Sequence, residues 1–356
     1  MTKVAILCPY PFGEAPSQRF RFEQYLEFLN SNDVQCTVFP FLNQQGWAFY
    51  YQTKKTRIKA TYVLVGWLKR WLLIPKLVTM DVVFIHREAA PVGPPIFEWV
   101  ICKLLRKRVI YDFDDAIWLP NYSKQHQQIH RLKAYWKVKY IIRWAQQIVV
   151  GNQFLADYAK QFNASVIIIP TTIDENYHTP LTPEPSGNEP VIGWTGTHTT
   201  VDYLKIITPV LERLATSFRF RVIVISNEEP TFFIPNLTFV PWDKHSEIHD
   251  LSQFTIGIMP LPDEPWTHGK CGFKGLQYMA LGIPTVASNI GVNAEIISHG
   301  VNGMIVNNED EWYQSLASLL ENEALRNVLG QQGKIRVHEC YSVSANQNKY
   351  LSLFNP

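Results

Sequence analysis

Charged residues are scarce in this chain: 18% of its 356 residues are Asp, Glu, Lys or Arg, against 46% hydrophobic residues. A chain with so much apolar side chain can bury two cores, which argues against disorder. Its few cysteines, Cys8, Cys36, Cys102, Cys271 and Cys340, lack the paired spacing of a disulfide framework. No charged-then-apolar leader begins the sequence, so we expect a cytoplasmic protein without disulfides.

Several function classes also lack their sequence signals. No period of about 20 to 50 residues repeats along the chain, which argues against a solenoid. No G-x-G-x-x-G follows the first predicted strand, so a nicotinamide-dependent oxidoreductase is the least favoured enzyme class. No recognisable nucleic-acid-binding module is present either, and we expect no nucleic acid as a partner.

Long uninterrupted apolar runs are missing as well. The apolar segment 61–78 contains Lys69 and Arg70 in its middle and Pro75 near its end, so it falls short of the roughly 20 residues that span a bilayer. This segment and 131–144, where lysines alternate with aromatic residues, have the composition of helices that lie on a membrane surface. Ordinary surface helices with one basic face explain the same pattern.

Charge is distributed unevenly along the chain. Residues 1–172 contain 22 Lys and Arg against 11 Asp and Glu, a balance of +11, whereas 173–356 contain 11 against 20, a balance of −9. The basic half indicates an anionic partner such as a membrane surface or a phosphorylated acceptor. Attraction between two oppositely charged domains is the alternative.

Short apolar, β-rich runs alternate with helical patterns throughout. The predicted strands are 4–10, 34–41, 82–87, 109–114, 147–152 and 165–172 in the first half, and 191–196, 221–226, 237–242, 255–260, 284–288 and 303–307 in the second. Helices are expected between them, for example at 17–30 and 131–147. Such alternation is typical of parallel sheets built from βα units.

The segment 173–190 is rich in Pro, Glu and Asn without periodicity, which indicates a linker between two domains. We therefore expect an N-terminal Rossmann-like domain at 1–172 and a second one at 191–340. The last helical pattern, 341–356, can pack back on the N-terminal domain. Two doubly wound α/β domains create a central cleft between the carboxyl ends of their sheets, where ligands bind.

Two loops of the first half carry candidate site residues. After the first strand, Gly13 allows close approach of a ligand to the backbone, and Ser17 is a candidate cap of the next helix. After the fourth strand, Asp112, Asp114 and Asp115 cluster at the strand end, where like charges need a partner. A Mg²⁺ or Mn²⁺ ion, a general-base role and a simple helix cap remain open for these carboxylates.

Two loops of the second half suggest a diphosphate site. The stretch VIGWTGTHTT leads from a strand through Gly196, Thr197 and His198 into a helix, and amides of such a turn can hold phosphate. In GKCGFKGLQYMALGIPTVAS, Lys270 and Lys274 flank a helix start near Cys271. Lysines oppose the dipole of a helix N-terminus unless an anion lies there.

The helix of this stretch is predicted to have two functional faces. Phe273, Leu276 and Ala280 share the face that packs, while Lys270, Lys274 and Gln277 share its neighbour. Gln277 is then a candidate partner for a ribose hydroxyl.

The sequence GKCGFKGLQYMALGIPTVASNIGVNAEIISHGVNGMIVNNEDEW resembles the nucleotide-sugar-binding segment of retaining glycosyltransferase family 4, the glycosyl transferases of group 1. The family has the two-domain GT-B fold. The resemblance implies sugar transfer from a nucleoside-diphosphate sugar with retained anomeric configuration and without an obligatory metal. It implies a glycan, lipid-linked or small-molecule acceptor on the N-terminal domain.

The resemblance also implies which residues contact the donor. Gly13 corresponds to the donor-contacting loop of the family, and GVNAEI, with Asn293 and Glu295, matches its Gly-x-x-Glu turn. The donor-binding candidates are Gly13, Gly196, Thr197, His198, Lys270, Cys271, Gly272, Phe273, Gln277, Asn293 and Glu295, and the catalytic candidates are Asp112, Asp114, Asp115 and Lys274.

The chain departs from the family at several positions. Gly269 and Gln277 stand where the family commonly has a pair of Glu, and Trp194 stands near its usual Arg. Lys270 and Lys274 are candidates to replace that positive charge. A non-catalytic nucleotide-sugar-binding relative and a nucleotide-sugar epimerase therefore remain alternatives to a transferase.

Overall fold

The computed structural model describes residues 1–50, 56–120, 132–180 and 189–355. Within them the chain divides into two compact units, the first formed by Met1–Thr171 with Asn346–Pro356 and the second by Thr172–Ala345. Arg131 of the expected basic segments, and 181–188 of the expected linker, lie outside the described residues.

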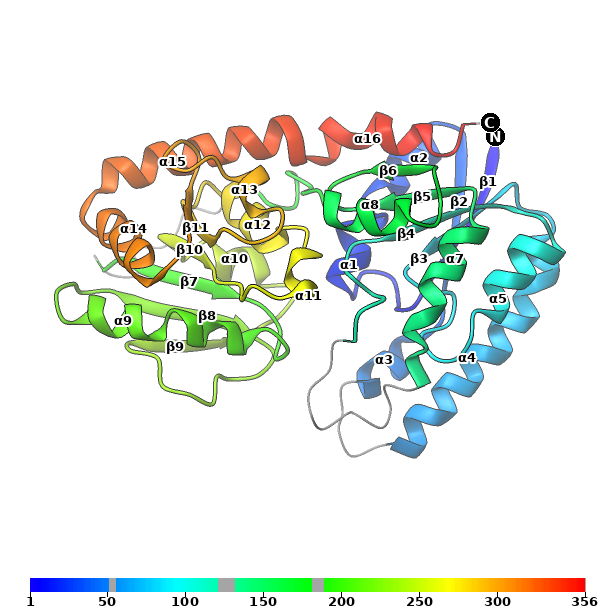
Figure 1. The fold of residues 1–356 in the computed structure, drawn as a ribbon, viewed down its shortest axis with the longest axis horizontal. Coiled ribbons are helices and arrows are strands. Elements are labelled where there is room, and N and C mark those ends of the chain that lie inside the picture. Colours follow the sequence, from blue (N-terminus) through cyan, green and yellow to red (C-terminus); the bar gives the residue numbers. More distant parts are fainter. Residues whose placement is uncertain (51–55, 121–131, 181–188, 356) are drawn as a thin grey trace. The chain divides into compact units, whose positions relative to one another are not determined.

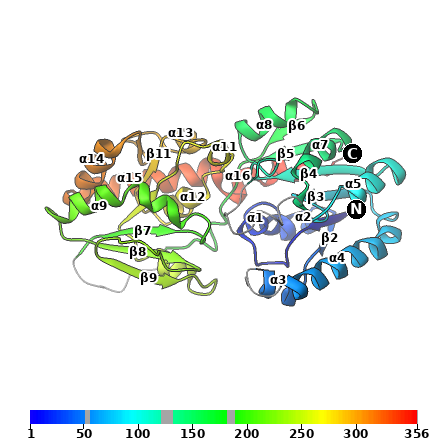
Figure 2. The same ribbon diagram turned by 60° about the horizontal axis from the view of Figure 1, so that its bottom comes forward.

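The first unit contains a parallel sheet of six strands in the order β2-β1-β3-β4-β5-β6 (Figures 1 and 2). Its strands are β1 (Thr2–Cys8), β2 (Val34–Pro40), β3 (Val82–His86), β4 (Arg108–Phe113), β5 (Gln147–Val150) and β6 (Val166–Ile168). Its helices are α1 (Pro16–Arg19), η1 (Glu23–Tyr25), α2 (Leu26–Ser31), α3 (Gln44–Tyr50), α4 (Thr56–Leu77), α5 (Ile96–Trp99), η2 (Val100–Leu104), η4 (Tyr135–Lys137), α7 (Val138–Trp144) and α8 (Gln153–Lys160).

The second unit contains another parallel sheet of six strands, in the order β12-β11-β10-β7-β8-β9. Its strands are β7 (Val191–Thr195), β8 (Arg221–Ser226), β9 (Leu237–Pro241), β10 (Ile256–Met259), β11 (Thr285–Ser288) and β12 (Met304–Val306). Its helices are η5 (Val201–Ile206), α9 (Thr208–Ala215), α10 (Glu247–Leu251), α11 (Pro265–His268), α12 (Phe273–Ala280), α13 (Asn293–Ile296), α14 (Glu309–Glu321), α15 (Glu323–Arg336) and η6 (Val337–Tyr341). The last helix of the chain, α16 (Val343–Ser352), leads back into the first unit.

All twelve predicted strands are present in the structure, because strands of a parallel sheet are buried on both faces and their sequences are nearly continuous apolar runs. Two helix predictions are wrong in extent. The expected helix 17–30 is broken into α1, η1 and α2, and the helix expected to reach residue 147 ends at Trp144, because Gln147 begins β5. Ser17 does not cap a helix: α1 begins at Pro16 after Ala15, without a side-chain cap.

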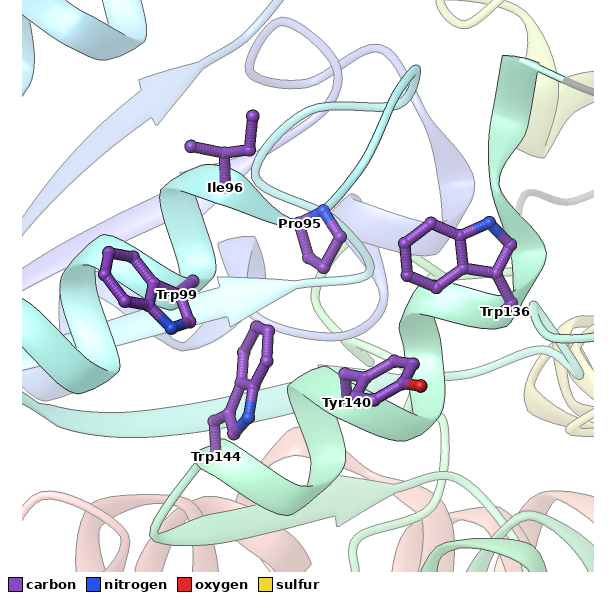
Figure 3. Close-up of a pocket in the computed structure, with 6 residues that line it drawn as sticks. All are labelled: Pro95, Ile96, Trp99, Trp136, Tyr140 and Trp144. Atoms are coloured by element: carbon purple, nitrogen blue, oxygen red, sulfur yellow. The ribbon is translucent and has the colours of Figure 1, made fainter.

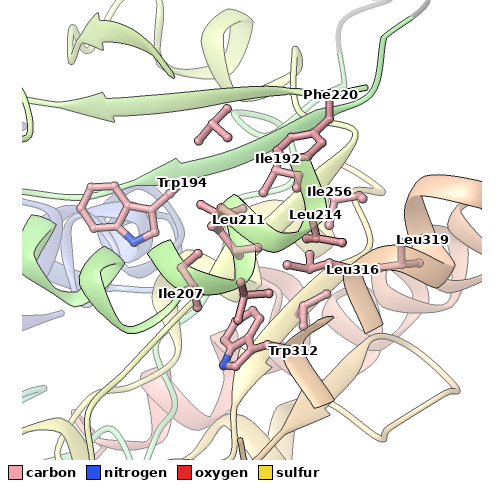
Figure 4. Packing of buried hydrophobic residues seen from close by; sticks show 14 of the residues in the cluster. Ile192, Trp194, Ile207, Leu211, Leu214, Phe220, Ile256, Trp312, Leu316 and Leu319 are labelled. Carbon is pink, nitrogen blue, oxygen red and sulfur yellow. The ribbon is translucent and has the colours of Figure 1, made fainter. Parts of the chain in front are cut away.

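One hydrophobic core of the second unit lies between its sheet and helices α9 and α14 (Figure 4). Ile192 of β7, Leu211 of α9 and Leu316 of α14 are fully buried there. Trp194 lies at one edge of this core and is only 1% exposed. The core therefore holds the carboxyl end of β7 in place, where the next loop begins.

Residues 173–180 of the expected linker belong to the second unit. Ile173 is fully buried and pairs with Ser342 in a β-bridge. His178 is 2% exposed and lies against α12. This packing covers the side of α12 that carries Gln277.

The end of the chain packs on the sheet of the first unit. The ring of Tyr350 stacks on Tyr25 with 4.2 Å between centroids, and it also meets Phe84 of β3. Arg108 donates to the carbonyls of Leu353 and Asn355. Residues 346–356 thus complete the first unit, on the face that also carries α2.

Candidate functional site

The order of the second sheet places a switch point between β7 and β10. The chain moves outward from β7 through β8 to β9, then returns to β10 and continues the other way to β12. Ligands of doubly wound folds bind where the carboxyl ends of two such strands diverge. The loops that follow β7 and β10 contain Gly196–Thr200 and Lys270–Lys274, both of which the sequence singles out.

The structure brings these two loops together through Lys274. Its Nζ lies 3.5 Å from the Oγ1 of Thr200 and 5.0 Å from the centroid of the Trp194 ring. Lys274 is the second residue of α12 and remains partly exposed. We call Trp194, Gly196, Thr200 and Lys274 the switch-point cluster.

Gly196 is required by the packing of this cluster. A Cβ at this position would lie 2.3 Å from the Trp194 ring and 2.9 Å from the Thr200 hydroxyl, closer than any side chain is tolerated. The loop backbone therefore lies directly on the indole. Figure 4 shows this ring at one end of the core.

The rest of the β7 loop is held by hydrogen bonds. The Thr197 hydroxyl lies 2.7 Å from that of Thr199. Asn227, which follows β8, accepts from the His198 amide at 2.8 Å and has its Nδ2 3.0 Å from the ring Nδ1 of His198. The imidazole of His198 is thus oriented by a residue from the neighbouring strand.

Helix α12 begins at Phe273, two residues after the start that the sequence predicts near Cys271. The N-cap Gly272 adopts a left-handed conformation at φ +70°, and a Cβ there would meet Ile296 at 2.2 Å, so glycine is required. Cys271 is buried. Lys270 precedes the helix and places its Nζ 5.1 Å from the centroid of the Trp266 ring.

Gln277 is not on an exposed face, which corrects the two-face prediction for α12. Its side chain is 1% exposed, and its Nε2 lies 3.2 Å from the Nε2 of His178. All residues of α12 from Gly275 to Ala280 are buried. The predicted contact of Gln277 with a ribose hydroxyl therefore conflicts with its position inside the second unit.

The two candidate residues of the GVNAEI turn, Asn293 and Glu295, differ in burial. Asn293 is 2% exposed and donates through Nδ2 to the Ser288 carbonyl, so it shapes the turn after β11. Glu295 is exposed, and its carbonyl accepts from Arg336. Two acidic residues lie shortly before Gly269 in the sequence. Glu264 caps α11, and the Asp263 carboxylate lies 2.7 Å from Nε2 of His268, so both contact residues of their own helix.

In the first unit, Asp112 at the end of β4 is completely buried in an ion network. One oxygen pairs with Arg21, and the other lies 2.7 Å from Nδ1 of His86 at the end of β3. An ionised carboxylate only accepts, so Nδ1 carries the proton. Burial alone would raise the pKa of Asp112, but Arg21 and His86 together hold it below its usual value.

Asp114 and Asp115 share a second arginine. The Nε of Arg87 donates to Asp114 at 2.8 Å, and its terminal nitrogen pairs with Asp115. Burial lowers the pKa of Arg87, but these two carboxylates raise it further, so the guanidinium stays charged. Arg87 reaches them from a left-handed backbone conformation, φ +59°, directly after β3.

The three carboxylates are therefore not left to repel one another. Sequence reasoning missed the partners Arg87 and His86, because 26 to 28 positions separate them from the aspartates. Among the described residues no group of three or more His, Cys, Asp or Glu side chains is arranged to hold a metal ion. Arg21 and Arg87 supply the positive charge that the three carboxylates need and for which a metal ion was one candidate.

Gly13 also has an internal contact. Its backbone is left-handed, φ +79°, and its amide donates to the Glu23 carboxylate at 2.8 Å. Gln18 binds both the amide and the carbonyl of Tyr10 in the same loop. The loop after β1 is thus built around two buried polar side chains rather than a helix cap.

Comparison with known proteins agrees with this architecture. Residues 189–322 match the family model of Glycosyl transferases group 1. No curated protein sequence matches the chain as a relative. The match includes the whole switch-point cluster and the GVNAEI turn.

Solved structures resemble nearly the whole chain. Sucrose-phosphate synthase from Thermosynechococcus elongatus is 14% identical with a TM-score of 0.71, over 99% of this chain and 98% of that one. Anabaena HepE in complex with UDP-glucose is 13% identical with a TM-score of 0.66, over 99% of both chains. The catalytic domain of starch synthase IV from Arabidopsis thaliana, bound to ADP and acarbose, is 10% identical with a TM-score of 0.70, over 99% and 98%. The expected GT-B fold, with two Rossmann-like units, is confirmed.

Proposed function

We propose that this protein is a glycosyltransferase that moves a sugar from a nucleoside-diphosphate sugar to an acceptor hydroxyl, with retention of anomeric configuration. The observation that carries the proposal is the meeting of Lys274 with the Gly196–Thr200 loop at the switch point of the second sheet. The match of 189–322 to Glycosyl transferases group 1 supports it. The Anabaena structure with UDP-glucose supports a nucleoside diphosphate as the leaving group.

The diphosphate is placed against the amino end of α12 in this proposal. Amides of a first helical turn point away from the helix carbonyls and favour an anion, and Lys274 and Lys270 add positive charge beside them. His198, oriented by Asn227, adds a further donor from the β7 loop. Cys271, Gly272 and Phe273 supply the backbone of the turn, and Thr197 and Glu295 remain candidates for contacts to the rest of the donor.

The proposed rate enhancement is electrostatic. Departure of the nucleotide from the anomeric carbon increases negative charge on the diphosphate, and a fixed ammonium group stabilises that charge more in the transition state than in the ground state. The acceptor hydroxyl attacks from the side of the leaving group, which gives retention, and its proton passes to the departing phosphate. Because the protein's own cations carry the diphosphate charge, we propose no obligatory metal.

The first unit is proposed to hold the acceptor. The Asp114 and Asp115 carboxylates, oriented by Arg87, are the candidates to accept hydrogen bonds from an acceptor hydroxyl. Asp112 is fully enclosed by Arg21 and His86, so we assign it a positioning role for the ends of β3 and β4. We propose a cytoplasmic enzyme whose acceptor is a glycan, a lipid-linked compound or a small molecule.

A panel of nucleotide sugars, each incubated with and without a membrane-lipid extract, tests this function through nucleotide release. We expect release with one preferred donor that increases with acceptor. Conversion of the donor without acceptor indicates an epimerase. Nucleotide-sugar binding without any release contradicts the transferase.

A non-catalytic binding protein is the second candidate, favoured by one observation. Where the family commonly has a pair of Glu, this chain has Gly269 and Gln277, and Gln277 is turned inward to His178. The donor sugar therefore lacks two carboxylate partners. The panel above separates this candidate from the transferase, because binding and release are measured on the same donors.

A further inference from the structure

Most exposed hydrophobic side chains among the described residues lie in one part of the first unit. Twelve of the nineteen large hydrophobic residues that are exposed among the described residues fall between positions 58 and 136. They are Ile58, Leu64, Val65, Leu68, Trp71, Leu72, Val78, Ile96, Trp99, Leu104, Leu132 and Trp136. We call these twelve residues the apolar face; they lie on or next to α4, α5, η2 and η4.

Helix α4 contributes an outward stripe. Leu64, Leu68 and Leu72, spaced four residues apart on one side of the helix, are 62%, 55% and 80% exposed. Leucines at such exposure in one row are unusual for a helix that has only water outside it, because apolar surface in water is unfavourable. At a rise of 1.5 Å per residue, the stripe extends about 12 Å along a helix of about 33 Å.

The rotation of α4 is fixed from its inner side by Arg70. This buried guanidinium donates to three backbone carbonyls, those of Ala89, Phe39 and Cys8, at 2.7 to 2.9 Å. Burial lowers the pKa of Arg70 to about 10, and it therefore stays charged at neutral pH. The outward direction of the leucine stripe is thus set by the fold.

Helices α5 and α7 form an aromatic hollow of about 330 Å³ beside this stripe. Figure 3 shows the aromatic side chains around it: Trp99 comes from α5, Trp136 from η4, and Tyr140 and Trp144 from α7. Pro95 and Ile96 complete the lining. The lining offers no carboxylate or amide side chain. It suits hydrocarbon better than a sugar, whose hydroxyls need hydrogen-bond partners.

The stripe and the hollow belong to one continuous side of the first unit. Trp67 and Trp71 of α4 contact the ring of Phe97 in α5, with centroids 4.7 and 5.0 Å apart. Helix α5 in turn shares the hollow with α7. The three helices therefore lie in the order α4, α5, α7 across the sheet, as Figure 1 also shows.

The charge on these helices has one sign at the surface. Helices α4, α5, η2, η4 and α7 contain Arg57, Lys59, Lys69, Arg70, Lys76, Lys103, Lys137, Lys139 and Arg143. Their single acidic residue is Glu98, which is 1% exposed and accepts from the Ala89 amide. Arg70 and Lys137 are buried, so the charged side chains that these helices expose fully or in part beside leucine and tryptophan are Arg57, Lys59, Lys69, Lys76, Lys103, Lys139 and Arg143, all of them cations.

We propose that the apolar face docks this protein on a membrane surface that carries anionic headgroups. Interfacial helices combine leucine and tryptophan on one side with lysine and arginine beside them, and each basic residue near an anionic leaflet adds attraction. A second copy of the chain is a poorer occupant, because it would bring two cationic surfaces together. No described helix is long and apolar enough to cross a bilayer, so the protein lies on the membrane through this face.

Flotation of the full chain with lipid vesicles tests the proposal, using vesicles of phosphatidylcholine alone and vesicles with about a third phosphatidylserine. We expect binding to the anionic vesicles and little to the neutral ones. Leu64→Ser, Leu68→Ser and Leu72→Ser in one chain are expected to weaken binding at least about tenfold, because they remove the inserted side chains. Lys69→Gln and Lys103→Gln are each expected to weaken it about fivefold at low salt.

The second unit provides a matched control. Phe233, Val301 and Val328 are 69%, 57% and 58% exposed, and replacing all three by Ser removes a comparable apolar area without touching the apolar face. This variant is expected to bind vesicles like the unaltered protein, and melting curves check that every variant is folded. Equal binding of all variants, or equal binding to both vesicle types, overturns the proposal.

A second copy gives a different result. If the apolar face joins two copies, sedimentation of the unaltered protein shows a dimer, and the triple leucine variant is a monomer. In that case neither the unaltered protein nor the variant binds vesicles. Vesicle binding needs no donor sugar, so this inference stands or falls separately from the proposed transferase activity.

Discussion

Replacement of Lys274 by alanine is the most direct test of the switch-point cluster. The ammonium lies over the Trp194 ring at 5.0 Å and beside the Thr200 hydroxyl at 3.5 Å, at the second position of α12. In the proposed complex it faces the diphosphate. Lys274→Ala removes this charge and leaves the backbone amides of the turn in place.

The magnitude follows from the kind of contact that is lost. A hydrogen bond to a charged group contributes roughly 1.5–3 kcal/mol, which corresponds to a decrease of about 10- to 150-fold in kcat/KM. If the ammonium contacts the diphosphate equally in ground and transition states, KM rises; if it acts on the developing charge, kcat falls. We expect mainly a fall in kcat. The fold is expected to lose only about 0.5–1 kcal/mol, the contribution of an exposed cation–π contact.

Nucleotide release with the preferred donor measures kcat and KM, and calorimetric titration with the free nucleoside diphosphate measures binding. Lys205→Ala is the matched control, because Lys205 makes a similar contact, 4.9 Å over the Phe232 ring, and pairs with Asp202. It is expected to leave release unchanged. If Lys274→Ala binds and releases nucleotide like the unaltered enzyme, the diphosphate does not lie at α12.

Three further predictions concern the framework of the site. Gly196→Ala places a Cβ 2.3 Å from the Trp194 ring, so urea unfolding is expected to show a loss of about 1–3 kcal/mol, and an unchanged midpoint contradicts the close packing. Asp112→Asn leaves Arg21 buried without its carboxylate and is expected to cost about 3–5 kcal/mol. Since the pKa of Asp112 is lowered, its stabilisation is present above pH about 4 and is lost as the pH falls further, and the Asn variant is expected to lack this acid-dependent part. Asn227→Ala removes the acceptor of a loop amide and is expected to raise KM for the donor with little change in kcat, as steady-state kinetics can show.

The strands could be predicted from the sequence because a single physical feature determines them. Parallel strands with helices on both faces are apolar at nearly every position. The two ends of an apolar run such as RVIVIS therefore predict the two ends of the strand. The helix expected at 17–30 follows a weaker rule. Gln18, Arg21 and Glu23 turn inward to make polar contacts, and local periodicity cannot show that a polar side chain is buried.

The candidate site was predictable to the level of loops. Both loops of the switch-point cluster follow strands whose order can be expected for a doubly wound sheet, and glycines and lysines mark them. The contacts of single side chains were not predictable. Gln277 lies near Lys274 on a helical projection, but His178, from a segment with the composition of a linker, covers its side of α12.

The charged residues of the first half of the chain lie in two different places. The acidic cluster at the end of β4 is neutralised within the first unit by Arg21 and Arg87, so it contributes little to the excess of basic residues there. Seven Lys and Arg side chains that are exposed or partly exposed lie on α4, η2 and α7, near exposed leucine and tryptophan. If the basic residues of 1–172 bound the donor diphosphate, we would expect them at the carboxyl ends of the strands. Here they surround an apolar surface instead, which is the arrangement that a membrane partner requires and a soluble phosphorylated acceptor does not.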